Sequence, residues 1–175
     1  TVLWIGAMTN AFNFLDNMDG LSAGIAAIAL IMLAFMAFLL RDFALATFCL
    51  ALFGALCGFL LYNLPPATIF MGDAGGLFLG FCTSAVAAIL SRSYAEATLY
   101  GLHQFAPLLV LAVPVYDFAS VNLIRIRNGA KPWIGDKNHI SHRLVRLGLS
   151  RRGAVLAIYG LTGLTTLPAL LALRF

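Results

Sequence analysis

The feature that most constrains this chain is the stretch of twenty residues from 21 to 40, LSAGIAAIALIMLAFMAFLL, which carries no charged side chain. At about 1.5 Å per residue, a helix of this length spans a hydrocarbon core of roughly 30 Å. The rest of the chain agrees, because 62% of its 175 residues are hydrophobic and only 10% are charged. This composition lies outside the range of soluble domains and predicts an integral membrane protein.

Other apolar runs predict further helices. They cover residues 2–15, 43–61, 75–91, 98–118 and 154–173. The sequence therefore predicts an all-α fold, a polytopic transmembrane bundle of about six helices that forms a single unit over residues 1–175. The chain opens at Thr1, directly in an apolar stretch and without a targeting segment, so we interpret it as the C-terminal part of a longer protein.

The basic residues predict the orientation of the bundle. If the first helix ends on the cytoplasmic side, the cytoplasmic segments are 16–20, 62–74 and 119–153. They carry Arg125, Arg127, Lys131, Lys137, Arg143, Arg146, Arg151 and Arg152, against Arg41, Arg92 and Arg174 on the other face. This bias follows the positive-inside rule and predicts a multi-pass protein of the cell inner (plasma) membrane. The basic excess would meet membrane lipids or phosphate groups, so it requires no nucleic acid as a partner.

Most acidic side chains fall in these same three segments or directly beside them. They are Asp16, Asp19, Asp73, Asp117 and Asp136, five of the seven acids in the chain. Carboxylates next to hydrocarbon are costly to keep, so their default interpretation is functional, as ligands for a cation or a phosphorylated substrate. The pattern predicts one catalytic site on the cytoplasmic face.

The first acidic segment is NAFNFLDNMDG, residues 10–20. Asn13, Asp16 and Asp19 recur every three residues, so they would project from one face and converge on one ligand if the helix continued. Alternatively, Asp19 only caps the helix that begins near Leu21. Capping alone leaves Asn13 and Asp16 unexplained in an otherwise apolar segment.

The second acidic segment is YNLPPATIFMGDAGGLFLG, residues 62–80. Its prolines end one helix, and its glycines permit a tight turn before the next. Asp73 then stands at a helix entrance, where unpaired backbone N–H groups can meet phosphate and a carboxylate can hold magnesium against it. The alternative role for Asp73 is a simple helix cap.

The third segment combines a bent helix with a long polar stretch. Pro107 and Pro114 predict a kink in helix 98–118, which Asp117 is expected to end. Beyond it, Asp136, His139 and His142 recur every three residues and would line one side of a helical turn, with Arg143 and Arg146 nearby to meet anionic oxygens. Alternatively, this basic stretch only anchors the protein to lipid. Zinc is disfavoured, because no further His or Cys lies near the histidines.

Together the three segments resemble the polyprenyl-phosphate N-acetylhexosamine-1-phosphate transferases. NAFNFLDNMDGLSAG is similar to that family's NAxNLxDGLDGLAxG, and IFMGDAGGLFLGF is similar to its FMGDxGSxxLGF. PVYDFASV and KPWIGDKNHISHRL resemble its PxxDxxxV and SPFxxDxxHxHHxL. The chain departs from these motifs at Asn17, where Gly is usual, at Gly76, where Ser is usual, and at Ser141, where His is usual.

The resemblance implies a magnesium-dependent membrane enzyme, with Mn²⁺ as an alternative ion. It would transfer N-acetylhexosamine 1-phosphate, in our interpretation GlcNAc-1-phosphate, from a UDP-sugar to polyprenyl (undecaprenyl) phosphate and release UMP for cell-wall or lipopolysaccharide intermediates. Catalysis would involve Asp16, Asp73, His139 and His142, with Asp73 as the metal ligand. Substrate would be bound by Asn13, Asp16, Asp19, Asn63, Phe70, Gly72, Asp136 and Arg143.

The resemblance also implies what lies outside this chain. Members of the family have about ten transmembrane helices, so six would form the C-terminal part. Their DDxxD motif has no match here, which would leave this chain catalytically incomplete on its own.

Other functions stay open. One is transfer of phospho-MurNAc-pentapeptide, although HxxHR and the short basic loop favour a UDP-GlcNAc enzyme. A transporter is a second, but its carboxylates would lie near the bilayer midplane rather than at helix ends. An inactive homologue is a third. Gly54 and Gly58 could form a homodimer seam, although we favour packing within the chain.

Overall fold

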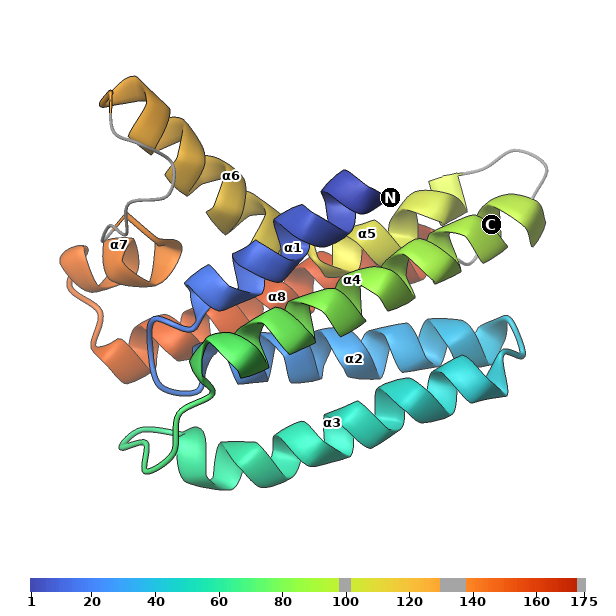
Figure 1. The fold of residues 1–175 in the computed structure, drawn as a ribbon, viewed down its shortest axis with the longest axis horizontal. Coiled ribbons are helices and arrows are strands. Elements are labelled where there is room, and N and C mark those ends of the chain that lie inside the picture. Colours follow the sequence, from blue (N-terminus) through green and yellow to red (C-terminus); the bar gives the residue numbers. More distant parts are fainter. Residues whose placement is uncertain (98–101, 130–137, 173–175) are drawn as a thin grey trace.

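The computed structural model describes residues 1–97, 102–129 and 138–172. All regular secondary structure in these ranges is helical (Figure 1). The helices are α1 (Val2–Leu15), α2 (Leu21–Leu39), α3 (Phe43–Asn63), α4 (Gly72–Ala97), the 3₁₀ helix η1 (Leu102–Phe105), α5 (Ala106–Val110), α6 (Ala112–Arg127), α7 (Ile140–Arg146) and α8 (Arg151–Ala172). The predicted all-α membrane fold is confirmed.

Three of these helices, α2, α3 and α4, are long and apolar enough to cross a membrane among the residues described. The bent pair formed by residues 103–110 and α6 would make a fourth if it counts as one span. α2 is the most buried of the three and packs against α3, α4 and α8. The first helix matches its predicted range, whereas α4 begins at Gly72 and continues to Ala97, beyond the predicted 75–91.

The predicted single helix over 98–118 is wrong. Its described part divides into η1, α5 and α6, and the chain bends by 67° between α5 and α6. The bend has a local cause, because Pro114 has no N–H to donate to Val110 and the helix ladder is interrupted there. The predicted kink is thus confirmed, but Asp117 does not end a helix: α6 continues past it to Arg127.

Helices α1 and α4 cross at very short range. A Cβ added to Gly80 would lie 2.6 Å from Thr9 Cα and 2.7 Å from the Met8 carbonyl oxygen. One turn earlier, a Cβ on Gly76 would lie 3.0 Å from Asn13 Cα. These two glycines let the backbones approach, which is how helices associate when lipid supplies no hydrophobic driving force.

The other glycine pair behaves differently. Gly54 and Gly58 lie on the exposed side of α3, and a Cβ on either would meet no described atom within 4 Å. The preference for packing within the chain is therefore wrong in the described part, and a homodimer seam there stays a prediction.

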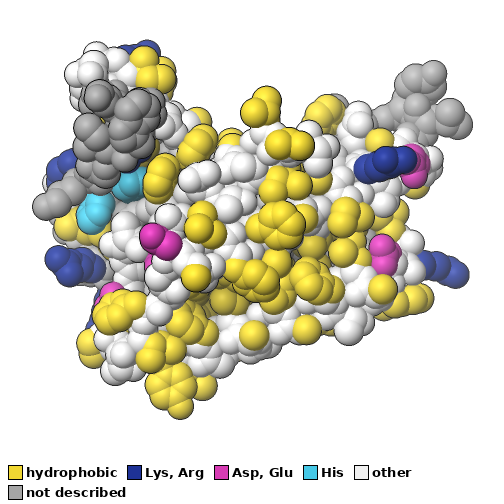
Figure 2. All heavy atoms as spheres, in the orientation of Figure 1, with side chains coloured by type: hydrophobic (Ala, Val, Ile, Leu, Met, Phe, Trp, Pro, Cys, Tyr) yellow, Lys and Arg dark blue, Asp and Glu magenta, His cyan; other side chains and the backbone are white. Residues whose placement is uncertain are grey.

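The loops divide between the two ends of the bundle (Figure 1). One end carries the α1–α2 loop, the α3–α4 loop and α7, and the other carries the α2–α3 loop and the end of α4. Figure 2 shows charged side chains at both ends, with mostly hydrophobic ones across the middle of this face. Within the described residues, the polar segments lie at one end of the bundle as predicted, whereas the cytoplasmic orientation of that end stays a prediction.

Candidate functional site

The end that carries α7 contains a cavity of about 160 Å³. Its walls come from the α1–α2 loop, the α3–α4 loop, α7 and α8. The lining residues are Asn17, Met18, Asp19, Pro65, His142, Arg151 and Val155. A carboxylate, an imidazole and a guanidinium therefore share one small space, which is a donor and acceptor set suited to an anionic, hydrogen-bonding ligand.

Backbone contacts hold the two acidic loops together beside this cavity. The Ala67 N–H donates to Asp19 Oδ2 at 3.2 Å, and the Gly20 N–H donates to Asn63 Oδ1 at 3.0 Å. The N-cap residue of α2 is Gly20 and the helix start has no side-chain cap bond, so the capping alternative for Asp19 is wrong. Asp19 instead ties the α1–α2 loop to the α3–α4 loop.

Asn63 is buried, and both ends of its amide have partners. Besides accepting from Gly20, it donates through Nδ2 to the Ile69 carbonyl oxygen at 2.8 Å. The side chain therefore shapes the α3–α4 loop from within, and its contact with substrate stays a prediction.

Three carboxylates influence one another at this end. Asp16 follows directly after α1, so the helix does not continue through it as the spacing pattern required. Burial raises the pKa of Asp16 above its usual range, and the charges of Asp19 and Asp73 raise it further. The three carboxylates repel one another, and the ionised form of Asp16 is disfavoured. A bound cation would reduce both the repulsion and the cost of ionising Asp16.

Asp73 stands in the first turn of α4 and is exposed, as are Phe70 and Gly72 just before it. Phe70 keeps 74% of its surface accessible. Gly72 has φ of 63°, a left-handed conformation that favours glycine and turns the chain into α4. The contacts of these residues with a nucleotide stay a prediction.

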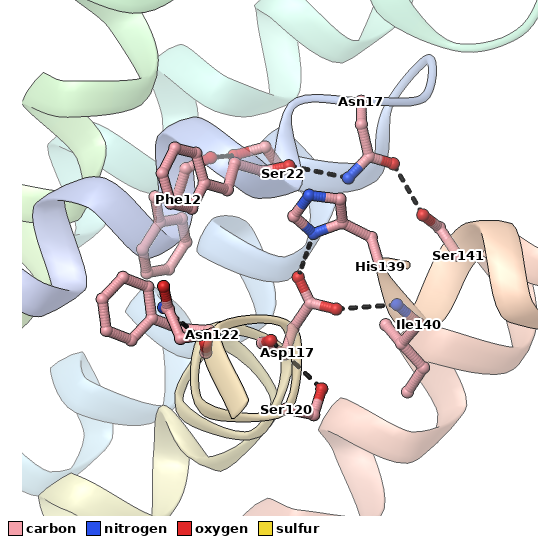
Figure 3. Close-up of polar contacts among 11 residues, drawn as sticks. Phe12, Asn17, Ser22, Asp117, Ser120, Asn122, His139, Ile140 and Ser141 are labelled. Atoms are coloured by element: carbon pink, nitrogen blue, oxygen red, sulfur yellow. Dashed lines mark hydrogen bonds and ion pairs between the residues drawn. The ribbon is translucent and has the colours of Figure 1, made fainter. Parts of the chain in front are cut away.

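His139 and His142 are separated by the structure. His139 is buried, and its Nδ1 lies 2.7 Å from Asp117 Oδ2 (Figure 3). Since an ionised carboxylate can only accept, we assign the proton to Nδ1. His142 instead lines the cavity. The expected row of Asp136, His139 and His142 is not seen in the described residues: His139 bonds Asp117, His142 lines the cavity, and Asp136 lies outside the described residues.

Asp117 is the link that sequence reasoning missed. Its second oxygen, Oδ1, accepts from the Ile140 backbone N–H at 2.7 Å, so one buried carboxylate holds both the His139 ring and the backbone of Ile140 (Figure 3). Phe14 packs around the pair, with its ring 6.2 Å from both Phe118 and His139. The sequence feature that could have indicated this role is a single Asp within an apolar helix.

The remaining predicted site residues lie nearby. Arg143 belongs to α7 and is half-buried, and Asn13 in α1 faces Gly76 of α4. Arg151 was not predicted as a site residue, although it begins α8 and lines the cavity. In the described ranges, no group of three or more His, Cys, Asp or Glu side chains forms a metal cluster.

Comparison with known proteins assigns the chain to a family. The family model described as glycosyl transferase family 4 matches residues 1–91. The chain belongs to this family.

Several curated relatives are similar over most of this chain. The "Probable undecaprenyl-phosphate N-acetylglucosaminyl 1-phosphate transferase" of Bacillus subtilis (strain 168) is 39% identical over 91% of the chain and 43% of its own length. The "Decaprenyl-phosphate N-acetylglucosaminephosphotransferase" of Mycolicibacterium smegmatis is 36% identical, over 93% and 44%. The "Undecaprenyl-phosphate alpha-N-acetylglucosaminyl 1-phosphate transferase" of Escherichia coli (strain K12) is 31% identical, over 90% and 43%. The chain thus spans less than half the length of these relatives.

Proposed function

We propose that this chain forms part of an enzyme that transfers GlcNAc 1-phosphate from UDP-GlcNAc to a polyprenyl phosphate and releases UMP. The observation that carries the proposal is the position of the carboxylates Asp16, Asp19 and Asp73 at one end of a membrane helix bundle, beside a cavity lined by His142 and Arg151. The names of its relatives, which describe transferases acting on undecaprenyl or decaprenyl phosphate, support the same activity.

The location suits the two substrates. A polyprenyl phosphate keeps its tail in the bilayer and its phosphate at the surface, whereas a nucleotide sugar arrives from water. A site at the ends of α1, α4 and α8 lies where these two phases meet. We propose that this end faces the cytoplasm, as the excess of basic residues there predicts.

The residues present fit a magnesium ion. Mg²⁺ is usually held by one or two carboxylates together with substrate phosphates, so it needs no cluster of three side chains. Asp73 is exposed and accessible to such an ion. Burial and acidic neighbours raise the pKa of Asp16, so its ionised form is disfavoured, and a bound ion would remove that cost. When bound, the ion would neutralise charge on the diphosphate and on the departing UMP.

The side chains would then position the phosphates for in-line transfer. An oxygen of the polyprenyl phosphate forms a bond to the β-phosphorus of UDP-GlcNAc, and the bond from that phosphorus to the oxygen of UMP breaks. Arg151 in the cavity wall, and Arg143 on α7, would meet phosphate oxygens with charge-assisted hydrogen bonds. His142 would orient the donor from the same wall.

The test follows the phosphorus atom. UDP-GlcNAc labelled with ³²P at the β-position is given to purified full-length protein with polyprenyl phosphate in detergent. Phosphosugar transfer moves the label into the lipid and leaves unlabelled UMP. Transfer of the sugar alone would leave the label in UDP, and that result would reject the proposed reaction. Replacing UDP-GlcNAc by UDP-MurNAc-pentapeptide in the same assay tests the alternative donor.

A further inference from the structure

We propose that Asn17 and Ser141 are positioning residues: their hydrogen bond holds α7 against the α1–α2 loop and so keeps His142 in the wall of the cavity. We call this contact the α7 clasp. The inference rests on the proposed function for its kinetic consequences, but the contact itself can be tested without any substrate.

The α7 clasp joins segments far apart in the sequence. Ser141 Oγ donates to Asn17 Oδ1 at 2.6 Å, across 124 residues (Figure 3). Asn17 is itself fixed, because its Nδ2 donates to the Phe14 carbonyl oxygen at 2.7 Å, at the end of α1. Ser141 is fully buried, so water cannot replace its partner.

The clasp works together with the contact at the start of α7. Asp117 of α6 holds His139 and the Ile140 N–H, and Ser141 is the next residue. Since α7 is only seven residues long, it has little stability of its own and takes its place from these contacts. His142 follows immediately and lines the cavity together with Asn17.

The two residues also depart from the family motifs in a complementary way. Asn17 stands where glycine is usual, and Ser141 stands where histidine is usual. One departure supplies an amide acceptor and the other a hydroxyl donor, and the fold brings them into contact.

The kinetic test is a double-mutant cycle on the full-length protein. Ser141→Ala should raise KM for UDP-GlcNAc about three- to tenfold, the range expected for one neutral hydrogen bond, and leave kcat and KM for polyprenyl phosphate within about twofold. In an Asn17→Ala background the same change should alter KM less than about twofold, because the contact is already absent. Rates are expressed per folded molecule, so a purely structural role would change yield and leave KM unmoved.

The matched control is Ser93→Ala. The Ser93 hydroxyl also bonds a carbonyl oxygen, that of Ile89 at 3.1 Å, but it does so within α4 at the opposite end of the bundle. This variant should leave every kinetic constant unchanged.

The contact is tested separately by cross-linking. Asn17→Cys with Ser141→Cys, in a cysteine-free background, should form a disulfide within one chain under mild oxidation, whereas Asn17→Cys with Ser93→Cys should not. Failure of the first pair to cross-link would overturn the clasp. Cross-linking together with a Ser141→Ala enzyme of unchanged KM would overturn its positioning role. Absence of transfer in the wild-type protein would instead reject the proposed function.

Discussion

Replacing Asp117 should show how strongly the histidine segment depends on one buried carboxylate. Asp117 is fully buried and accepts from His139 Nδ1 and from the Ile140 N–H, each at 2.7 Å. Asp117→Ala would leave both donors unpaired in a site that is closed to water. The structure therefore predicts a large loss of stability together with loss of the site.

The size of the loss follows from those two contacts. A hydrogen bond to a charged group contributes about 1.5–3 kcal/mol, and removing one partner of a buried pair costs about 3–5 kcal/mol. We expect Asp117→Ala to lower the free energy of unfolding by roughly 3–5 kcal/mol. Asp117→Asn should cost about 1–3 kcal/mol, because its oxygen can still accept from Ile140 while its NH₂ can donate to His139 Nδ1 in the other tautomer.

The assay is unfolding of the full-length protein in detergent, followed by tryptophan fluorescence. His139→Ala should lower the free energy of unfolding by at least about 1 kcal/mol less in the Asp117→Ala background than in the wild type, since the His139–Asp117 pair is already broken there. The matched control is Asn122→Ala on the same helix, because the Asn122 amide donates to the Phe118 carbonyl oxygen within α6, at 2.8 Å (Figure 3). The structural role of the pair would be refuted if Asp117→Ala lost no more stability than Asn122→Ala. It would also be refuted if the losses of Asp117→Ala and His139→Ala were additive in the double variant.

Three further predictions concern the carboxylates, the helix crossing and the topology. Because the folded-state pKa of Asp16 is raised, stability should fall as pH increases from its usual 3.8 to that raised pKa, and Asp16→Asn should remove this decrease in a pH series of unfolding measurements. Gly80→Ala should push α1 from α4 and lower the free energy of unfolding by about 1–3 kcal/mol or more, whereas Gly54→Ala, with open space around it, should change it little; equal losses would contradict the close crossing. Asn138→Cys should react with impermeant thiol reagents only from the cytoplasmic side, and labelling of intact cells from outside would reject the orientation.

The helices could be predicted because apolar length alone identifies them. The twenty uncharged residues from 21 to 40 correspond to α2, and the charged or glycine-rich breaks before Phe43 and near Gly72 set the neighbouring helices. The course of residues 102–127 could not be predicted in detail. A proline shows that the helix ladder is interrupted, but how far the chain then bends depends on packing against α1 and α8.

The sequence was enough to predict several residues of the site, but not how those residues contact one another. Hydrocarbon makes isolated carboxylates conspicuous, so Asp16, Asp19 and Asp73 were identified from the sequence. Spacing could not reveal that His139 turns to Asp117 while His142 lines the cavity, because α7 begins between them and its placement depends on contacts with distant segments. For the same reason Ser141 read only as a departure from a motif, whereas the structure makes it a partner of Asn17.

Asp73→Asn, studied in a magnesium titration of UDP-GlcNAc transfer to polyprenyl phosphate with purified full-length protein, tests the proposed function most directly. The amide keeps the shape of the side chain but loses the charge proposed to hold the ion, so transfer should be abolished at every magnesium concentration. Asp42→Asn is the matched control: Asp42 accepts from the Leu45 N–H at the start of α3, at the opposite end, and asparagine caps equally well, so its transfer rate should equal that of the wild type. Near-normal turnover of Asp73→Asn at low magnesium would reject Asp73 as the ligand of the ion.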